Sequence, residues 1–113
     1  MNPPFSKSVD GYELQFATNH LGHFLLANLL LDELRAGKPS RLVVLSSDAH
    51  RYASTLSLDD INYEKSSYHP WMAYGRSKAC NILFAREFDQ RFANEGIRAN
   101  ALRPGKIIRC NHV

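Results

Sequence analysis

The apolar run Leu42-Val-Val-Leu45 is the feature that most constrains the fold of this 113-residue chain. It predicts a short strand from Arg41 to Ser47. The hydrophobicity is continuous rather than alternating, which is typical of a parallel strand that is covered on both faces. Parallel strands need neighbouring strands and covering helices, so the run predicts an α/β sheet.

Helical periodicity flanks this strand on both sides. Apolar residues recur at spacings of three and four from about 10 to 36, and Asp10 is the predicted N-cap with Glu13 in capping-box register. A second helix is predicted over about 71–94 and a second strand over 97–102. The intervening residues 48–73 are polar and predict a long loop with about one helical turn, of the kind that often carries function. Two strands cannot complete a parallel sheet alone.

Composition narrows the class of protein. Hydrophobic residues make up 44% of the chain and charged residues 22%. These values are typical of a soluble globular protein, and the length allows one domain, 1–113. The net charge of +3 is spread along the chain, which argues against nucleic-acid binding. The most apolar stretch, 24–31, falls short of the ~20 residues of a membrane span. No secretory signal is recognisable, so a cytoplasmic location is expected. Two cysteines make no disulfide framework, and Cys80 reads as a core residue.

Tyr74 and Lys78 are the first candidate pair for chemistry. They are four residues apart, so a helix places them on the same face. A free tyrosine has a pKa of ~10, and an adjacent lysine ammonium would lower it toward a range useful for acid–base catalysis. The spacing alone is weak, because roughly 0.2 such pairs arise by chance in this composition. Without further context, a surface tyrosine beside a solvated lysine is the simpler interpretation.

Ser47 and Asn19 supply that context. Ser47 follows the predicted strand at the carboxyl edge of the sheet, where α/β folds bind ligands, and its hydroxyl could donate to a developing oxyanion. It could also be an ordinary strand-end serine, and Ser46 competes for the role. Asn19 interrupts an apolar helical run. It is either a tolerated polar residue or one whose side chain, or local helix distortion, positions a water.

His20 and His23 are three residues apart and could bind a metal ion. No third ligand stands at a standard spacing, so no metal site is expected.

Together, Asn19, Ser47, Tyr74 with Lys78, and Pro104-Gly105 resemble the short-chain dehydrogenase/reductase family. The strings Thr18-Asn-His-Leu-Gly-His-Phe-Leu-Leu26, Ser46-Ser-Asp-Ala-His50 and Tyr74-Gly-Arg-Ser-Lys-Ala-Cys-Asn-Ile-Leu-Phe84 are similar to its branch of retinol dehydrogenases and the WW-domain-containing oxidoreductase. As a set these motifs are highly specific, and they cover the chain up to about Gly105.

The resemblance implies an NAD(P)-dependent oxidoreductase that transfers a hydride between the cofactor and an alcohol or carbonyl, often a retinoid, steroid or other lipid. Tyr74 would be the acid–base, and Ser47 would hold the substrate oxygen. Lys78 would bind the nicotinamide ribose and lower the tyrosine pKa, while Asn19 would hold a water in the proton relay. Tyr74, Lys78, Pro104 and Gly105 would contact the cofactor, with NADP commoner than NAD in this branch.

Departures from the family pattern shape the expected fold. Family members begin with a strand and a Gly-rich turn that seats the pyrophosphate, whereas the six glycines here are widely separated. The resemblance therefore implies the central portion of a Rossmann-type doubly wound parallel sheet, lacking the first strands and the C-terminal part, with 106–113 as a divergent tail. Weak cofactor binding, or none, is expected of the chain alone.

A second function is compatible with the same residues. In the family, the helices at about 10–36 and 71–94 commonly form a dimer interface that resembles a four-helix bundle. The chain could thus be a catalytically inactive fragment that pairs with a full-length relative or with itself. Full-length relatives can be membrane-associated, but no membrane span is expected in this chain.

Overall fold

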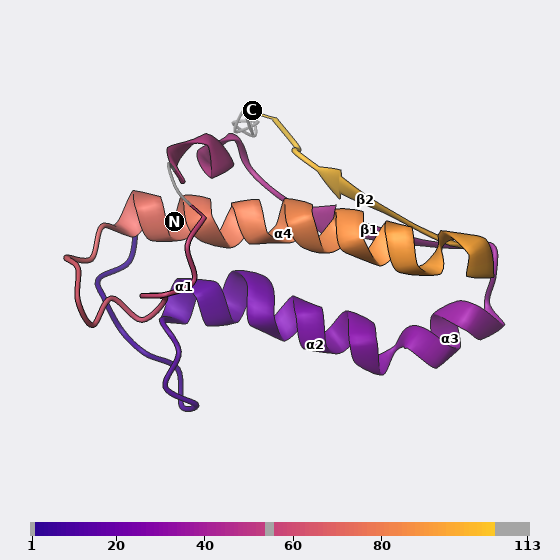
Figure 1. Cartoon of the computed structure of the whole chain (residues 1–113), viewed down its shortest axis with the longest axis horizontal. Helices are drawn as coiled ribbons and strands as arrows, with labels where there is room; N and C mark the ends of the chain where they lie inside the picture. The colour runs from indigo at the N-terminus through magenta and orange to yellow at the C-terminus, as the bar shows by residue number, and fades with distance from the viewer. Residues whose placement is uncertain (1, 54–55, 106–113) are drawn as a thin grey trace, which may run out of the picture.

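The computed structural model describes residues 2–53 and 56–105 (Figure 1). In chain order the elements are α1 (Leu14–Phe16), the π-helical turn η1 (Ala17–Leu21), α2 (Gly22–Leu29), α3 (Leu31–Ala36), β1 (Ser40–Leu45), the 3-10 turn η2 (Asp48–Tyr52), α4 (Pro70–Phe92), the 3-10 turn η3 (Ala93–Glu95) and β2 (Ile97–Leu102). The helix, strand, helix, strand alternation is confirmed.

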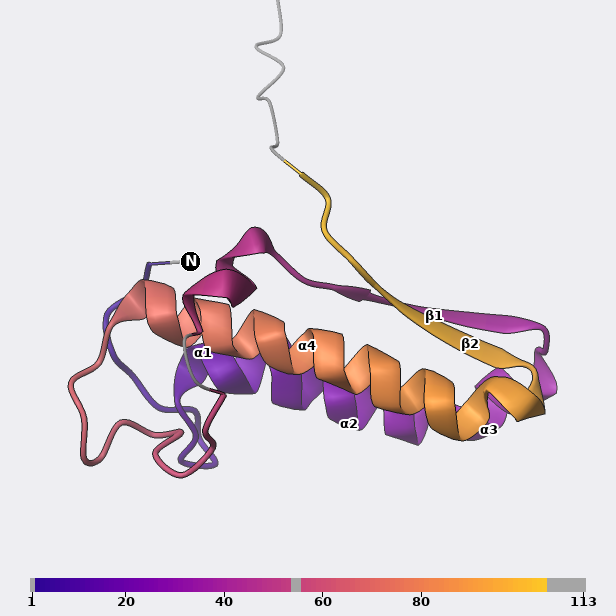
Figure 2. The same cartoon turned by 45° about the horizontal axis from the view of Figure 1, so that its top comes forward.

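The two strands pair in parallel, as the continuous apolar run predicted. The register runs from Ser40 opposite Ile97 to Leu45 opposite Leu102. α4 packs along the sheet with α2 beside it, so both long helices cover the same face (Figures 1 and 2). The core between these layers consists of Ala27, Val44, Phe84, Ala85, Phe88, Ile97 and Ala99.

The sequence predicted that both faces of β1 are covered. In the described residues only one face is covered, so that part of the prediction is wrong for them. Val44 faces the helices and is 5% exposed, whereas Val43 and Leu45 are 56% and 54% exposed. Side chains alternate between the two faces of a strand, and all the described helices that pack on this sheet lie on one side of it (Figure 2).

The first helix begins four residues later than predicted, and Asp10 is not its N-cap. Gly11 adopts φ +87°, and Ser8 N donates to Tyr12 O at 2.7 Å, so this segment forms a tight turn instead. The cap is Glu13, which is 1% exposed and accepts from the backbone N–H groups of Gln15 and Phe16. A carboxylate suits these free N–H groups and the positive end of the helix.

α4 begins at Pro70 and ends at Phe92, close to the predicted 71–94. Proline at the first position lacks only an N–H that would be unpaired anyway. After η3, Gly96 adopts φ +83°. This is the left-handed conformation that commonly ends a helix, and here it turns the chain into β2.

The predicted loop before α4 is anchored to that helix. Arg76 is buried and donates to the main-chain oxygens of Asp60 and Ile61 at 3.3 and 2.6 Å, and its guanidinium lies 4.6 Å from the centre of the Tyr63 ring. Hydrogen bonds from Ser66 and from the backbone of residues 64–66 hold the pKa of Asp60 at about 2. The loop is therefore fixed in place by these polar contacts.

Within the parts of the chain that the structure describes, none of the helices has the length and apolarity needed to cross a membrane.

Candidate active site

Asn19, Tyr74 and Lys78 line one cleft of about 390 Å³, together with Pro3, Leu14, Gln15 and Thr18. Tyr74 and Lys78 come from α4, one turn apart, as their spacing predicted. Asn19 comes from η1, which packs across that turn of α4. Three of the six predicted site residues are thus brought together.

Lys78 lies beside the Tyr74 ring. Its Nζ lies 5.6 Å from the centre of the Tyr74 ring and donates to the main-chain oxygen of Leu45 at 3.3 Å. Partial burial lowers the pKa of Lys78, because desolvation disfavours the ammonium form. The helix thus supplies the cation, and the end of β1 orients it.

Asn19 lies in the π-helical turn Ala17–Leu21, so the local helix distortion considered from the sequence is present. Its Nδ2 donates to Ser77 Oγ at 3.0 Å, and Ser77 Oγ donates in turn to Tyr74 O at 2.7 Å. Short π-helical turns within α-helices are frequent at functional sites. A water held by Asn19 stays a prediction.

The two candidate serines have different surroundings. Ser46 is 6% exposed, and its hydroxyl donates to the main-chain oxygen of Lys78 at 2.9 Å. Ser47 is half-buried at the N-cap of η2, where its Oγ accepts from Ala49 N at 3.2 Å. Only Ser47 therefore has a hydroxyl proton with no partner in the described contacts, although it does not line the cleft of Asn19, Tyr74 and Lys78.

Pro104 and Gly105 lie just beyond β2, are exposed, and are not among the residues of this cleft. The described chain there leads away from α4 (Figure 2). The predicted tail 106–113 lies outside the described residues.

The two histidines considered as metal ligands make hydrogen bonds instead. His20 Nδ1 lies 3.0 Å from Asn81 Oδ1, and His23 Nδ1 lies 3.0 Å from Asn19 O. Among the described residues, no group of three or more His, Cys, Asp or Glu side chains could hold a metal ion.

Sequence reasoning missed Ser77 and Asn81, both nearly fully buried on α4. A signal was available, because polar residues at 74, 77, 78 and 81 recur at spacings of three and four and so mark one helix face. Gln15 was also missed. Its side-chain Nε2 donates to Tyr68 Oη and Pro70 O at 2.9 Å each, which ties the cleft wall to the start of α4.

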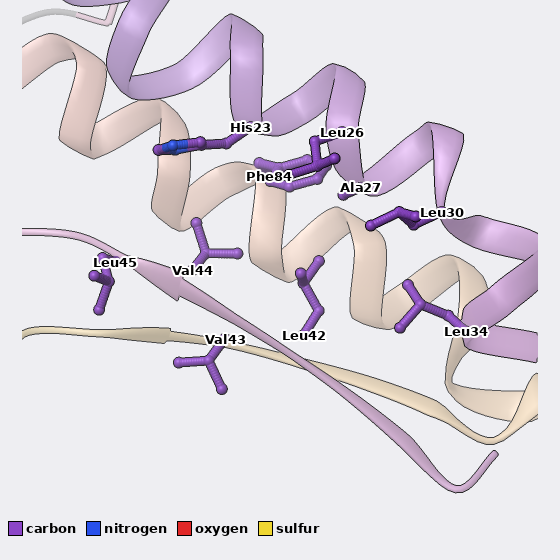
Figure 3. Close-up of a pocket in the computed structure, with 10 residues that line it drawn as sticks. All are labelled: His23, Leu26, Ala27, Leu30, Leu34, Leu42, Val43, Val44, Leu45 and Phe84. Atoms are coloured by element: carbon purple, nitrogen blue, oxygen red, sulfur yellow. The ribbon is translucent and has the colours of Figure 1, made fainter. Parts of the chain in front are cut away.

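A second hollow of about 330 Å³ lies between α2, α3 and β1 (Figure 3). Leu42 and Val44 point into it toward the helices, whereas Val43 points away. Its walls are His23, Leu26, Ala27, Leu30, Leu34, Leu42, Val43, Val44, Leu45 and Phe84. With one imidazole among hydrocarbon side chains, it has few groups to orient a reacting ligand.

The chain is similar to known oxidoreductases. It is 48% identical over 108 residues to human retinol dehydrogenase 14 and 47% identical over 105 residues to human retinol dehydrogenase 13, covering 96% and 93% of this chain. It is 40% identical over 114 residues to the human WW domain-containing oxidoreductase, covering 96% of the chain. These matches span 31%, 31% and 28% of the relatives' own lengths.

A solved structure matches the fold. The crystal structure of an uncharacterized protein from Mycobacterium paratuberculosis superimposes with a TM-score of 0.81 at 43% identity, covering 93% of this chain and 38% of that one. The described elements thus correspond to part of a larger Rossmann-like α/β fold. No protein-family model matches the chain.

Proposed function

We propose that this chain carries the catalytic residues of an NAD(P)-dependent oxidoreductase that interconverts an alcohol and a carbonyl compound. The chain is homologous to part of the short-chain dehydrogenase/reductases of the retinol dehydrogenase branch. The convergence of Tyr74, Lys78 and Asn19 in one cleft carries this proposal. Each residue type suits the role that the family pattern gives it, and the three come from two elements far apart in the sequence.

In the reduction direction, the Tyr74 hydroxyl gives its proton to the substrate oxygen, and in oxidation the phenolate takes that proton back. The Lys78 ammonium, 5.6 Å from the centre of the Tyr74 ring, supplies a positive charge beside the residue that exchanges this proton. Ser47 donates a hydrogen bond to the substrate oxygen, and Asn19 holds a water through which Tyr74 and Lys78 regain their protons. A nicotinamide, when bound, supplies or accepts the hydride at the substrate carbon.

The described residues fit one end of such a cofactor. Lys78 offers an ammonium donor and Tyr74 a hydroxyl beside the cleft, which suits the nicotinamide ribose. At the phosphate end they do not fit, because no Gly-rich turn leads into a helix in 2–53 or 56–105, and such a turn is what commonly seats the phosphates. We therefore expect these residues alone to bind NADP, or NAD, weakly.

The substrate proposed is a hydrophobic alcohol or aldehyde such as a retinoid, steroid or other lipid, since two of the relatives are named retinol dehydrogenases. A hollow of about 370 Å³ lined by Tyr52, His69, Trp71 and Met72 supports an apolar ligand. The Trp71 ring centre lies 6.1 Å from that of Tyr74, so this hollow adjoins the acid–base residue.

Replacing Tyr74 with phenylalanine tests the proposal. With NADPH in large excess to offset its weak binding, oxidation of NADPH with a long-chain aldehyde or retinal should fall by about 10²- to 10⁴-fold, the usual contribution of an acid–base group. Tyr12→Phe is the matched control, since Tyr12 lies in the turn before α1, outside the cleft. A Tyr74→Phe protein as active as the control would overturn the proposal.

A second candidate function rests on the outward face of α2. Leu25 and Leu29, four residues apart, are 57% and 69% exposed. Two large apolar side chains so exposed on one turn of a short helix are unusual for a solvated face. This surface favours a role as an interaction partner, through α2 and α4, of another copy or of a full-length relative. In sedimentation experiments, the double variant Leu25→Glu with Leu29→Glu should dissociate an assembly that Asn28→Ala leaves intact. An assembly that survives both leucine substitutions would exclude this face.

A further inference from the structure

Asn81 is a buried polar residue of α4 that the proposed reaction does not use. It is 1% exposed and lies one turn beyond Ser77. Its Nδ2 donates to Asn19 O and to Leu45 O, each at 3.0 Å. Its Oδ1 lies 3.0 Å from His20 Nδ1. One side chain therefore bonds to the π-helical turn, to the end of β1 and to a histidine.

The contacts of Asn81 fix both its amide orientation and the His20 tautomer. The main-chain oxygens of Asn19 and Leu45 can only accept hydrogen bonds, so the atom facing them must be the NH₂ group. Oδ1 then faces His20, and Nδ1 of His20 must carry a hydrogen to donate to it. Burial lowers the pKa of His20, which favours a neutral ring protonated at Nδ1 alone.

The two carbonyl groups that Asn81 engages belong to the site itself. Leu45 O also accepts from Lys78 Nζ at 3.3 Å, so Asn81 and Lys78 share one acceptor. Asn19 is held twice, by Ser77 through its side chain and by Asn81 through its main chain. Ser77 and Asn81 stand four residues apart on α4, and together they hold the π-helical turn against that helix.

We propose that Asn81 is a positioning residue that sets Asn19 and Lys78 relative to each other in the cleft, with His20 holding the Asn81 amide in the required orientation. The link to catalysis rests on the proposed function. The geometric part, a fixed Asn19 and an Nδ1–H His20, can be measured without any turnover.

The first test is the His20 tautomer in the wild-type chain, read from the ring ¹⁵N chemical shifts at neutral pH. We expect protonation at Nδ1. A ring protonated at Nε2 would overturn the proposal, because it could not donate to Asn81. This measurement needs no variant and so does not depend on a substitution that could unfold the chain.

The second test compares Asn81→Asp with Asn28→Ala. Asn81→Asp keeps an acceptor for His20 but removes both N–H donors. We expect it to shift the NMR signals of the Asn19 side-chain amide. Amide hydrogen exchange over 17–21 should become faster by about tenfold or more, because one to two hydrogen bonds are lost. Asn28→Ala removes a bond of the same type, Nδ2 to Phe24 O at 2.8 Å, away from the cleft. Equal behaviour of the two variants at Asn19 would overturn the proposal.

The third test measures turnover of a long-chain aldehyde with NADPH. Asn81→Asp should lower kcat by about tenfold to a hundredfold with little change in KM, because it displaces reacting groups rather than the substrate pocket. A change confined to KM would contradict a positioning role. Absence of turnover in the wild type even in a large excess of NADPH would count against the proposed function, while the two spectroscopic tests would still decide the geometry around Asn81.

Discussion

Gly75 of α4 and Ala49 of η2 approach so closely that a Cβ atom on Gly75 would stand 2.2 Å from the carbonyl oxygen of Ala49. Gly75 directly follows Tyr74, and Ala49 lies two residues after Ser47. The absence of a side chain at 75 therefore lets the turn that carries Ser47 rest on the helix that carries Tyr74.

The variant Gly75→Ala tests this contact. No flexible side chain can yield, because the opposing atom is backbone, so η2 must move away from α4. We expect a loss of about 1–3 kcal/mol in the free energy of unfolding, as for other overpacked sites.

Gly22→Ala is the matched control for that variant. Gly22 has a helical φ of −61°, and the nearest atom to an added Cβ stands at 3.4 Å. The control should therefore be neutral or stabilising by up to about 1 kcal/mol. Urea denaturation of both variants measures the difference, and equal stabilities would contradict the close contact.

Lys78 should lose its proton at a lower pH than a free lysine. Burial lowers its pKa below the ordinary 10.5, because the half-buried ammonium is poorly solvated. The folded chain thus releases this proton before the unfolded chain does, so the cost of burying the charge is relieved as pH rises through the folded pKa toward the ordinary value. NMR titration of the Lys78 Nζ environment should show a midpoint below 10.5, which returns to the ordinary value in denaturant. The same midpoint in both states would contradict the burial.

The sequence was most informative where one physical signal dominated. The continuous apolar residues 42–45 predicted a parallel strand, and the boundaries of β2 at 97–102 were matched. The start of the first helix was missed, because Asp10 is of a residue type preferred at N-caps whereas Glu13, which caps the helix, is not. The turn at Gly11 places Asp10 outside the helix, and the apolar pattern of the sequence does not show this turn.

Predicting the candidate site was harder, because long-range contacts position its residues. The spacing of Tyr74 and Lys78 was enough to place them together. The sequence also offered a helix distortion at Asn19 as one interpretation, but it could not show that Ser77 and Asn81 hold that turn from 58 and 62 residues away. Nor could composition or spacing separate Ser46 from Ser47, whose difference lies in which hydroxyl α4 buries.

His20 should make the stability of the chain depend on pH. Its folded-state pKa lies below the ordinary 6.5, chiefly because burial disfavours the imidazolium. The folded chain therefore binds fewer protons than the unfolded chain. The stability that neutral His20 contributes is fully present above pH 6.5 and is lost as pH falls from there through the folded pKa. The slope cannot exceed about 1.4 kcal/mol per pH unit.

Urea denaturation at pH 7.5 and 5.5 measures this dependence. The loss of stability between the two should be smaller for His20→Asn than for wild type. His23→Gln, which keeps the half-buried His20 ring, should retain most of the dependence. A His20→Asn protein with the full wild-type loss would show that another group is responsible.

Paired alanine substitutions should separate the two serines. Ser46→Ala removes a buried hydroxyl that donates to Lys78 O, so it should lower the free energy of unfolding by about 1 kcal/mol. Ser47→Ala removes only the turn contact with Ala49 N, so stability should change little. If the Ser47 hydroxyl donates to the substrate oxygen, the same variant should lower turnover by about 10²- to 10³-fold, the usual cost of one lost oxyanion donor. Urea denaturation and aldehyde reduction on both variants give the comparison. A Ser46→Ala protein that folds normally but loses the larger share of turnover would transfer the role to Ser46.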